Sequence, residues 1–250
     1  MARTKIYFAS DFHLGAPNEA VSAARERKII AWLDSISDDV AELYLVGDIF
    51  DFWFEYKHAV PKGFIRFLGK LALLRDAGVA IHIFIGNHDL WLGDYLTKEL
   101  GIIVHYEPLQ IERNGQYFFI AHGDGLGPGD KNYKCMKRIF TNPLCKWLFK
   151  WLHPDLGIGL ASFLSRRSRA QQSNTETFLG KENEWLYLYS NRKVKSLPHI
   201  NYFIFGHRHL PLDLVLENES SRYINLGEWL HSYTYGVFDG QEMKLLTYTI

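Results

Sequence analysis

Five short apolar runs in this chain each end in a polar turn that carries carboxylate, imidazole or amide side chains. The runs occupy residues 5–10, 42–47, 79–86, 115–121 and 200–206. They are rich in β-branched and aromatic residues and too short for a helix, so each predicts a buried strand. Because open α/β sheets bind ligands at the carboxyl ends of their strands, we expect the polar turns to gather into one site.

Segments with a helical pattern separate the first of these runs. Residues 22–36, 63–78 and 95–101 have this pattern, and Gly78 supplies a stop signal for the second of them. Alternating strands and helices indicate an α/β fold. From about residue 200 the pattern changes to consecutive strands joined by turns. We therefore expect mixed sheets, packed as two layers with helices outside.

The composition is that of a globular protein, but the charge is unevenly distributed. The 250 residues are 47% hydrophobic and have no formal net charge. Residues 126–195 hold 13 Lys and Arg against 5 Asp and Glu, whereas the remainder holds 15 against 23. Cys135 and Cys145 have no disulfide or zinc spacing, which favours a reducing compartment. We expect neither a signal peptide nor a spanning helix, because no apolar stretch reaches about 18 residues.

The polar turns hold candidate metal ligands. Asp11 and His13 follow the first run, and residues two apart point to the same side of an extended segment, where they can grip one ion. The other turns contribute Asp48, Asp51, Asn87, His88, Asp89, His122, His207 and His209. Each turn alone is a weak signal, but five in succession after apolar runs are not a chance pattern. We expect Asp51 and Asp89 to orient a ligand or to close a turn.

The types of ligand indicate which metals the turns would bind. Carboxylate, imidazole and amide groups without a thiolate favour Mn²⁺, Fe or Zn²⁺ over Mg²⁺. Asp48 is the candidate to bridge two ions. Two ions about 3.5–4 Å apart can clamp the attacking and leaving oxygens of a phosphoryl displacement. The sequence thus predicts a hydrolytic site with two divalent metal ions, with Mn²⁺ as the first candidate and Fe or Zn²⁺ as alternatives.

The chain resembles the calcineurin-like metallophosphoesterases in the order of its motifs. These are Asp11-x-His13, Gly47-Asp48-x-x-Asp51, Gly86-Asn87-His88-Asp89, His122 and Gly206-His207-x-His209. The resemblance implies a four-layer α/β/β/α sandwich of two mixed sheets. It implies one metal held by Asp11, His13, Asp48 and His209. It implies a second metal held by Asp48, Asn87, His122 and His207. Asn87 and His88 are the implied catalytic residues, with His88 facing the phosphate.

Within that superfamily the chain resembles the UDP-2,3-diacylglucosamine hydrolases of lipid A biosynthesis. The likeness lies in "GDIFDFWFEY" and in "HGDGLGPGDKNYK", which a basic, apolar helical segment follows. It implies one domain over residues 1–250 with a helical insertion, or lid, at about 126–195. It also implies hydrolysis of UDP-2,3-diacylglucosamine to UMP and 2,3-diacylglucosamine 1-phosphate. The best-known members carry Arg where this chain has His88, so we expect His88 to act chiefly as a cation beside the phosphate.

The predicted insertion carries two apolar stripes at helical spacing, in residues 144–152 and 156–164. Such stripes are compatible with an ordinary core and with a cleft for two acyl chains. On the second interpretation the residues expected to contact substrate are Asp130, Tyr133, Trp147, Arg166, Arg167, Ser168 and Arg169. Lysines such as Lys146 and Lys150 could contact anionic lipid heads or simply face solvent.

The resemblance implies a cytoplasmic protein that is peripheral on the inner membrane of a Gram-negative bacterium. Its expected partners are a lipid-linked nucleotide sugar and the membrane surface, and no nucleic acid. Two alternatives stay open. The chain could be another metallophosphoesterase that acts on nucleotides, phosphoproteins or other phosphodiesters. It could also be a metal-dependent scaffold without catalysis, although a scaffold does not need the complete set of ligands that is present.

Overall fold

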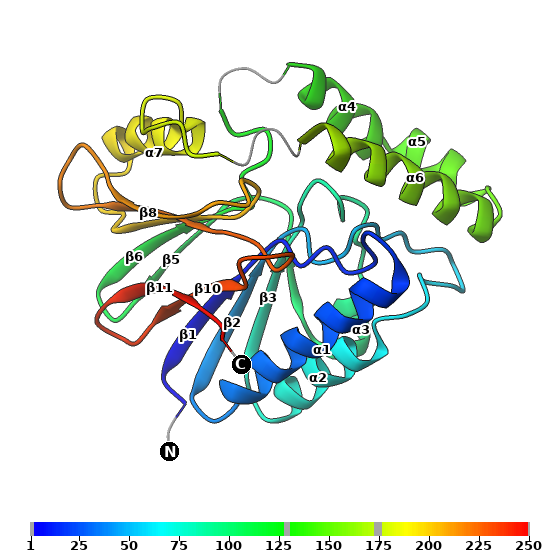
Figure 1. Cartoon of the computed structure of the whole chain (residues 1–250), viewed down its shortest axis with the longest axis horizontal. Helices are drawn as coiled ribbons and strands as arrows, with labels where there is room; N and C mark the ends of the chain where they lie inside the picture. The colour runs from blue at the N-terminus through cyan, green and yellow to red at the C-terminus, as the bar shows by residue number, and fades with distance from the viewer. Residues whose placement is uncertain (1–2, 128–130, 173–176, 250) are drawn as a thin grey trace.

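The computed structural model describes residues 3–127, 131–172 and 177–249, and it describes no side chains at 131–133, 162 and 166–172. Two β-sheets pack face to face, and helices cover both outer faces (Figure 1). Both sheets mix parallel and antiparallel neighbours. The α/β fold with two mixed sheets is therefore confirmed.

The first sheet has the strand order β11-β10-β1-β2-β3-β4. Its strands are β1 (Lys5–Ala9), β2 (Val40–Val46), β3 (Ala80–Phe84), β4 (Ile103–His105), β10 (Thr234–Phe238) and β11 (Met243–Thr247). β1, β2, β3 and β4 run parallel, whereas β10 runs antiparallel to β1 and β11. The turns after β1, β2 and β3 consequently meet at one edge of this sheet.

The second sheet has the strand order β5-β6-β7-β9-β8. Its strands are β5 (Leu109–Arg113), β6 (Gln116–Ile120), β7 (Tyr202–Phe205), β8 (Pro211–Val215) and β9 (Arg222–Leu226). β6, β7 and β9 run parallel, and β5 and β8 are antiparallel edge strands. The turns after β6 and β7 therefore also share one edge.

Helices form the two outer layers. α1 (Glu19–Ser35), α2 (Ile65–Asp76) and α3 (Tyr95–Leu100) cover the first sheet, and α7 (Trp185–Ser196) covers the second (Figure 1). Three apolar clusters fill the interfaces: one between α1–α3 and the first sheet, one between the sheets, and one beneath α7. Burial at three interfaces accounts for the four predicted layers.

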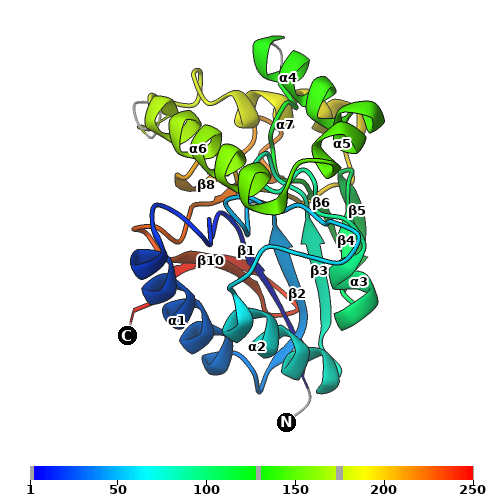
Figure 2. The same ribbon diagram turned by 90° about the vertical axis from the view of Figure 1, so that its right-hand side faces the viewer.

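Three further helices stand off the sheets: α4 (Lys131–Thr141), α5 (Pro143–Lys150) and α6 (Pro154–Gln172). Figure 2 shows them above the end of the sandwich toward which β2 and β3 point. α5 begins at Asn142, whose side chain accepts a hydrogen bond from the N–H of Leu144 at 2.8 Å. Within the described ranges, no helix has the length and apolarity required to cross a membrane.

The sequence pattern does not predict β4, β5 or α7. β4 has only three residues, which is too few for a periodic signal. β5 pairs with β6 across the turn at Asn114 and Gly115, where both residues have positive φ. This turn is the type that joins two strands of a hairpin, and it supplies a local signal for β5.

Candidate metal and active site

The turns that follow the strands hold several candidate ligands in an unusual backbone conformation. The angle φ is 55° at Asp11, 44° at His13, 52° at Asp48, 68° at His207 and 52° at His209. Residues other than glycine rarely adopt this left-handed region, and they do so where the surrounding structure holds them in place. The fold thus imposes the directions of these five side chains.

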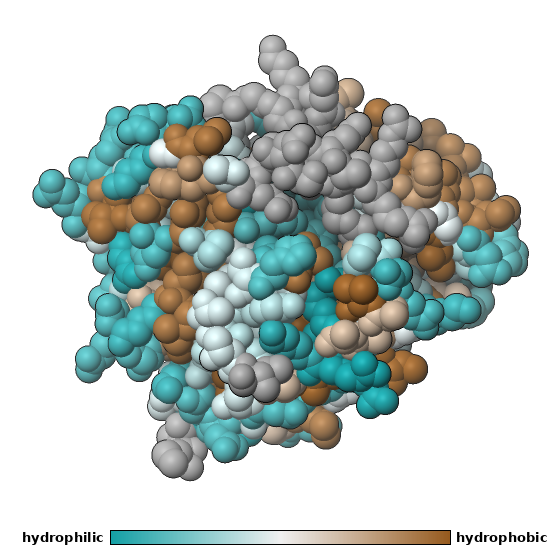
Figure 3. All heavy atoms as spheres, in the orientation of Figure 1, coloured by the Kyte–Doolittle hydropathy of each residue, from teal (hydrophilic) through white to brown (hydrophobic). Residues whose placement is uncertain are grey.

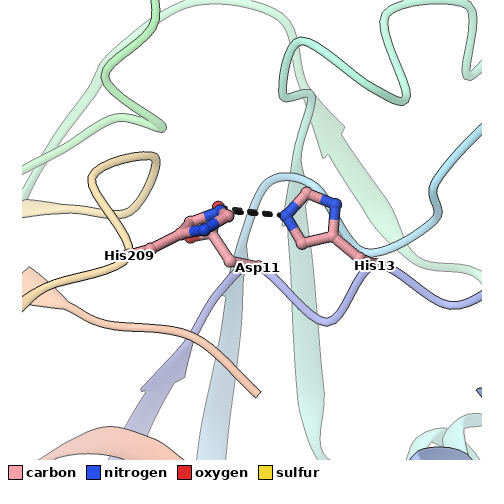
Figure 4. A group of neighbouring side chains, drawn as sticks. All are labelled: Asp11, His13 and His209. Carbon is pink, nitrogen blue, oxygen red and sulfur yellow. Dashed lines mark hydrogen bonds and ion pairs between the residues drawn. The ribbon is translucent and has the colours of Figure 1, made fainter. Parts of the chain in front are cut away.

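Asp11, His13 and His209 form the first group of candidate ligands (Figure 4). The Nε2 atoms of His13 and His209 lie 3.0 Å apart, and Asp11 Oδ1 lies 3.7 Å and 3.2 Å from them. Asp11 Oδ1 is buried and has no hydrogen-bond donor among the residues that the structure describes. A buried carboxylate oxygen beside two converging imidazole nitrogens fits a divalent cation.

Asp48, His122 and His207 form the second group. His122 donates its Nδ1–H to the carbonyl oxygen of Val46 at 2.8 Å, so its Nε2 is left for a ligand. The oxygen of the Asn87 side chain lies 2.8 Å from His207 Nδ1 and 3.3 Å from His122 Nε2. The amide oxygen therefore joins this group, and its set of donors also fits a divalent cation.

Asp48 lies between the two groups. Its Oδ2 is 3.4 Å from His122 Nε2 and 3.9 Å from His13 Nε2, and its Oδ1 accepts the backbone N–H of His88 at 2.8 Å. Burial raises the pKa of Asp48, but the nearby His122 and His88 outweigh burial and lower it well below its usual range. One oxygen of an ionised carboxylate is thus placed where it can serve both groups.

Three glycines leave room for these ligands. A Cβ on Gly86 would overlap Asp48 Oδ1, and a Cβ on Gly47 would overlap His122 Nδ1. A Cβ on Gly206 would lie 2.5 Å from Asp11 Oδ2. At Gly86 and Gly206 the reason for glycine is this close approach, because only Gly47 has a positive φ.

A family model of calcineurin-like phosphoesterases matches residues 4–211, which include every candidate ligand. The chain belongs to this family. As a phosphoesterase of this family it is a metal-dependent hydrolase, and the family implies a dinuclear divalent-metal site. The two ligand groups around Asp48 are the candidates for that site.

The phosphoesterase is also similar along its whole length to curated proteins named UDP-2,3-diacylglucosamine hydrolase. The protein of that name from Porphyromonas gingivalis is 43% identical, over 97% of this chain and 97% of that protein. One from Pseudomonas putida is 29% identical, over 90% of both chains. One from Aeromonas salmonicida is 28% identical, over 95% of this chain and 91% of that protein.

His88 of the phosphoesterase lies beside both ligand groups. Its ring is 4.9 Å from the ring of His13, measured between centroids. Its Nδ1 lies 2.8 Å from Ser165 Oγ, 3.3 Å from the carbonyl oxygen of Asp51 and 3.5 Å from Asp51 Oδ1. Asp51 therefore stands where an orienting residue is expected. Motif patterns alone do not reveal the contact with Ser165.

Asp89 closes the turns behind the site. Its carboxylate accepts the backbone N–H groups of Gly86 at 2.6 Å and Ile49 at 2.8 Å. Two separate turns are thereby tied together, as expected for this residue.

Two ion pairs near the site are not predicted by the sequence. Lys137 binds Asp124 at 2.5 Å, and Arg208 binds the buried Glu184 at 3.2 Å.

The structure describes only one of the predicted substrate residues in full. Trp147 lies on α5 with 55% of its surface exposed. Asp130 lies outside the described residues. The side chains of Tyr133, Arg166, Arg167, Ser168 and Arg169 lie outside them too, although their backbone belongs to α4 and α6.

Aromatic side chains hold the helices α4–α6 against the loops that follow β2 and β3, which are called the frame below. Phe149 of α5 lies 4.7 Å from Phe54 and 4.5 Å from Trp91, between ring centroids. Trp91 donates its indole N–H to the carbonyl oxygen of Phe140 at 2.6 Å. Phe54, in the aromatic stretch that follows Asp48 and Asp51, is thus one of the residues against which these helices pack.

Proposed function

We propose that this phosphoesterase hydrolyses UDP-2,3-diacylglucosamine to UMP and 2,3-diacylglucosamine 1-phosphate, a step of lipid A biosynthesis. The observation that carries this proposal is an exposed apolar surface on α5, on α6 and at two residues between them, close to the ligand groups. Its members are Leu144, Trp147, Leu148, Trp151, Leu152, Leu156, Leu160, Phe163 and Leu164. Their exposure ranges from 39% at Leu152 to 75% at Trp151. They are therefore not an ordinary core, and a diacylated substrate would bury such a surface.

The position of this apolar surface supports a role in binding lipid. Figure 3 shows hydrophobic residues gathered at the right of the molecule, where Figure 1 places α5 and α6. Lys146 and Lys150 lie on α5 among the apolar residues. Cations beside an apolar face favour a surface of anionic lipid. We infer a cytoplasmic protein that contacts the inner membrane peripherally, with the lipid-linked nucleotide sugar as its partner and no nucleic acid.

We assign the metal ligands as the family pattern implies. Asp11, His13, Asp48 and His209 would hold one ion, and Asp48, Asn87, His122 and His207 would hold the other. Mn²⁺ is the proposed metal, and Fe or Zn²⁺ suits the same donors. Two such ions, when bound, activate water and offset the negative charge that develops on the phosphoryl group.

His88 and Asn87 are the proposed catalytic residues. The backbone N–H of His88 fixes Asp48, and its ring lies next to His13, so the ring can face a phosphate bound between the two groups. A cation there would stabilise charge on the phosphoryl oxygens. Asn87 would hold the imidazole rings of His122 and His207 in position through its amide oxygen, which contacts a ring nitrogen of each.

We further propose that residues 1–250 act as a single unit, with an insertion at about 126–195 that receives the acyl chains. α4–α6 are the part of this insertion that stands off the sheets. Asp130, Tyr133, Trp147 and residues 166–169 are its proposed contacts with substrate. Arginines at 166, 167 and 169 would suit the diphosphate, because guanidinium groups bind phosphate oxygens in pairs.

Release of UMP from UDP-2,3-diacylglucosamine tests the proposed function. The purified protein with Mn²⁺ should release UMP, and chelator-treated protein should regain activity only after metal is added back. UDP-glucose should be a poor substrate because it lacks acyl chains. Equal rates on the two nucleotide sugars would favour a general nucleotide phosphoesterase instead. If elemental analysis shows that the protein lacks metal and the protein is still fully active, the proposed metal ions take no part in the reaction.

Trp147→Ala should raise KM for the diacylated substrate by about 10-fold, as loss of one buried aromatic contact predicts. Hydrolysis of a small nitrophenyl diester should change by less than about twofold, because this substrate makes no remote contacts. Leu73→Ala is the matched control, since Leu73 is also exposed but lies on α2. An equal loss on both substrates would make Trp147 a structural residue.

A further inference from the structure

Ser165 contacts the catalytic histidine from a distant part of the chain. It lies on α6 and stands 77 positions from His88 in the sequence. Its hydroxyl oxygen is 2.8 Å from His88 Nδ1 and 3.2 Å from the carbonyl oxygen of Asp51. A side chain from the helices above the sheets therefore reaches the imidazole of the active site.

The carbonyl group decides the direction of these hydrogen bonds. A carbonyl oxygen only accepts, so the hydroxyl of Ser165 must donate its proton to Asp51 O. The hydroxyl then accepts a hydrogen bond, and the donor that it faces is the Nδ1–H of His88. Both oxygens of Asp51 near Nδ1 are acceptors as well. Nδ1 therefore carries a proton in the positively charged ring as well as in a neutral one.

This arrangement leaves the other ring nitrogen available. In the part of the chain that the structure describes, every hydrogen-bond partner of the His88 ring lies on Nδ1. Nε2 remains for the substrate or for a transferred proton. The ring orientation depends on Ser165 most directly, because the contact with Ser165 is shorter than either contact with Asp51.

The structure seats α6 closely enough to hold this contact. A Cβ on Gly157 would overlap Tyr56 Oη and lie 3.1 Å from Phe149. The backbone of α6 therefore comes close to these two residues at its glycine, where no side chain intervenes. Ser165 follows about two helical turns later. Lys137 and Asp124 tie α4 to the loop after β6 at the other side. The hydroxyl is thus delivered by docked helices rather than by a free loop.

We propose that Ser165 is a positioning residue for His88. It orients the imidazole by accepting the Nδ1–H, so the catalytic histidine is aligned only while α4–α6 are docked. These helices consequently contribute to the chemical step as well as to the binding of substrate. The inference rests on the catalytic role proposed for His88 and concerns catalysis on any substrate that the enzyme accepts.

Ser165→Ala should lower kcat by about 10-fold, the effect of one lost orienting hydrogen bond, while KM stays within about twofold. Ser165→Thr keeps the hydroxyl and should retain most of the activity. Ser165→Cys keeps the volume with a weak acceptor, so it should resemble Ala and carries the test if the alanine variant is unstable. Thr141→Ala is the matched control, because among the described residues that hydroxyl bonds only to carbonyls of its own helix. Wild-type kcat in the Ala and Cys variants would show that Asp51 alone is sufficient to orient the His88 ring, and it would overturn the proposal.

A double-mutant cycle separates positioning from other roles. In a His88→Ala background, Ser165→Ala should cause no further loss of kcat, because its target is gone. A further 10-fold loss there, about the size of the single effect, would mean that Ser165 acts on the substrate or on docking. The loss of kcat should follow this pattern on both substrates, the diacylated nucleotide sugar and the nitrophenyl diester. If the wild type cleaves only the diester, the proposed substrate fails while the Ser165 test still stands.

A spectroscopic signal tests the contact without activity. Zinc-loaded protein labelled with ¹⁵N on histidine should show an imidazole proton that is absent in His88→Ala. This signal should persist in Ser165→Thr and be lost or shifted in Ser165→Ala. An unchanged signal in Ser165→Ala would contradict the proposal, as would metal contents that differ between the variants and the wild type.

Discussion

Asp48→Ala should lower kcat by about 10³-fold or more, because two bound ions supply several kcal/mol to a phosphoryl transfer. The carboxylate lies within 4 Å of ligand nitrogens from both groups, at 3.4 Å from His122 and 3.9 Å from His13. It also accepts the backbone N–H of His88. One substitution should therefore weaken both proposed metal sites and loosen the turn that carries His88, the proposed catalytic histidine.

Elemental analysis beside kinetics checks this result. The wild type should bind two ions per chain, and Asp48→Ala should bind fewer. Asp38→Ala is the control, since Asp38 is an exposed carboxylate in the turn that leads into β2, two residues before that strand begins. Two tightly bound ions in Asp48→Ala, together with substantial activity, would remove Asp48 from its bridging role.

His88→Ala should lower kcat on the diphosphate by about 10²-fold, the cost of removing one electrostatic donor. His88→Arg should keep a substantial fraction of the wild-type rate. A sugar phosphate is already a good leaving group, so a fixed cation beside the phosphoryl oxygens meets the main requirement. The backbone N–H at position 88 continues to serve Asp48 in both variants.

A second substrate separates the roles of charge and proton transfer. On an ester with a poor alkoxide leaving group, Arg at position 88 should not rescue activity, because that reaction requires a general acid. The measurement is kcat for wild type, Ala and Arg variants on both substrates. If the Arg and Ala variants are equally inactive on the diphosphate, His88 acts as a proton donor or organises the metal site, and the electrostatic account is wrong.

The positions of the candidate ligands could be predicted from the sequence because each depends on a local pattern. An apolar run followed by a turn predicts a strand end, and parallel strands end at one edge. Asp11, Asp48 and Asn87 each follow such a run in the first sheet, and His122 and His207 do so in the second. Glycine before a ligand was also visible, although its steric reason at Gly86 and Gly206 was not.

The exposure of the apolar stripes was decided only by the tertiary structure. Helical spacing is the same for a side chain in a core and for one at a surface, because it reports one helix and not what lies opposite. The exposed Trp151 and Leu156 show that nothing within the described chain covers this face.

The contact of Ser165 with His88 depended on tertiary structure in a similar way. Seventy-seven positions separate the two residues, and no periodicity connects them. Phe149 against Phe54, and Gly157 against Tyr56, set the distance between α6 and the frame. The sequence by itself determined the family, most of the strands and the groups that can bind metal. The contact proposed to align the His88 imidazole arose only from the packing of distant segments, since a hydrogen bond requires positions accurate to a few tenths of an ångström.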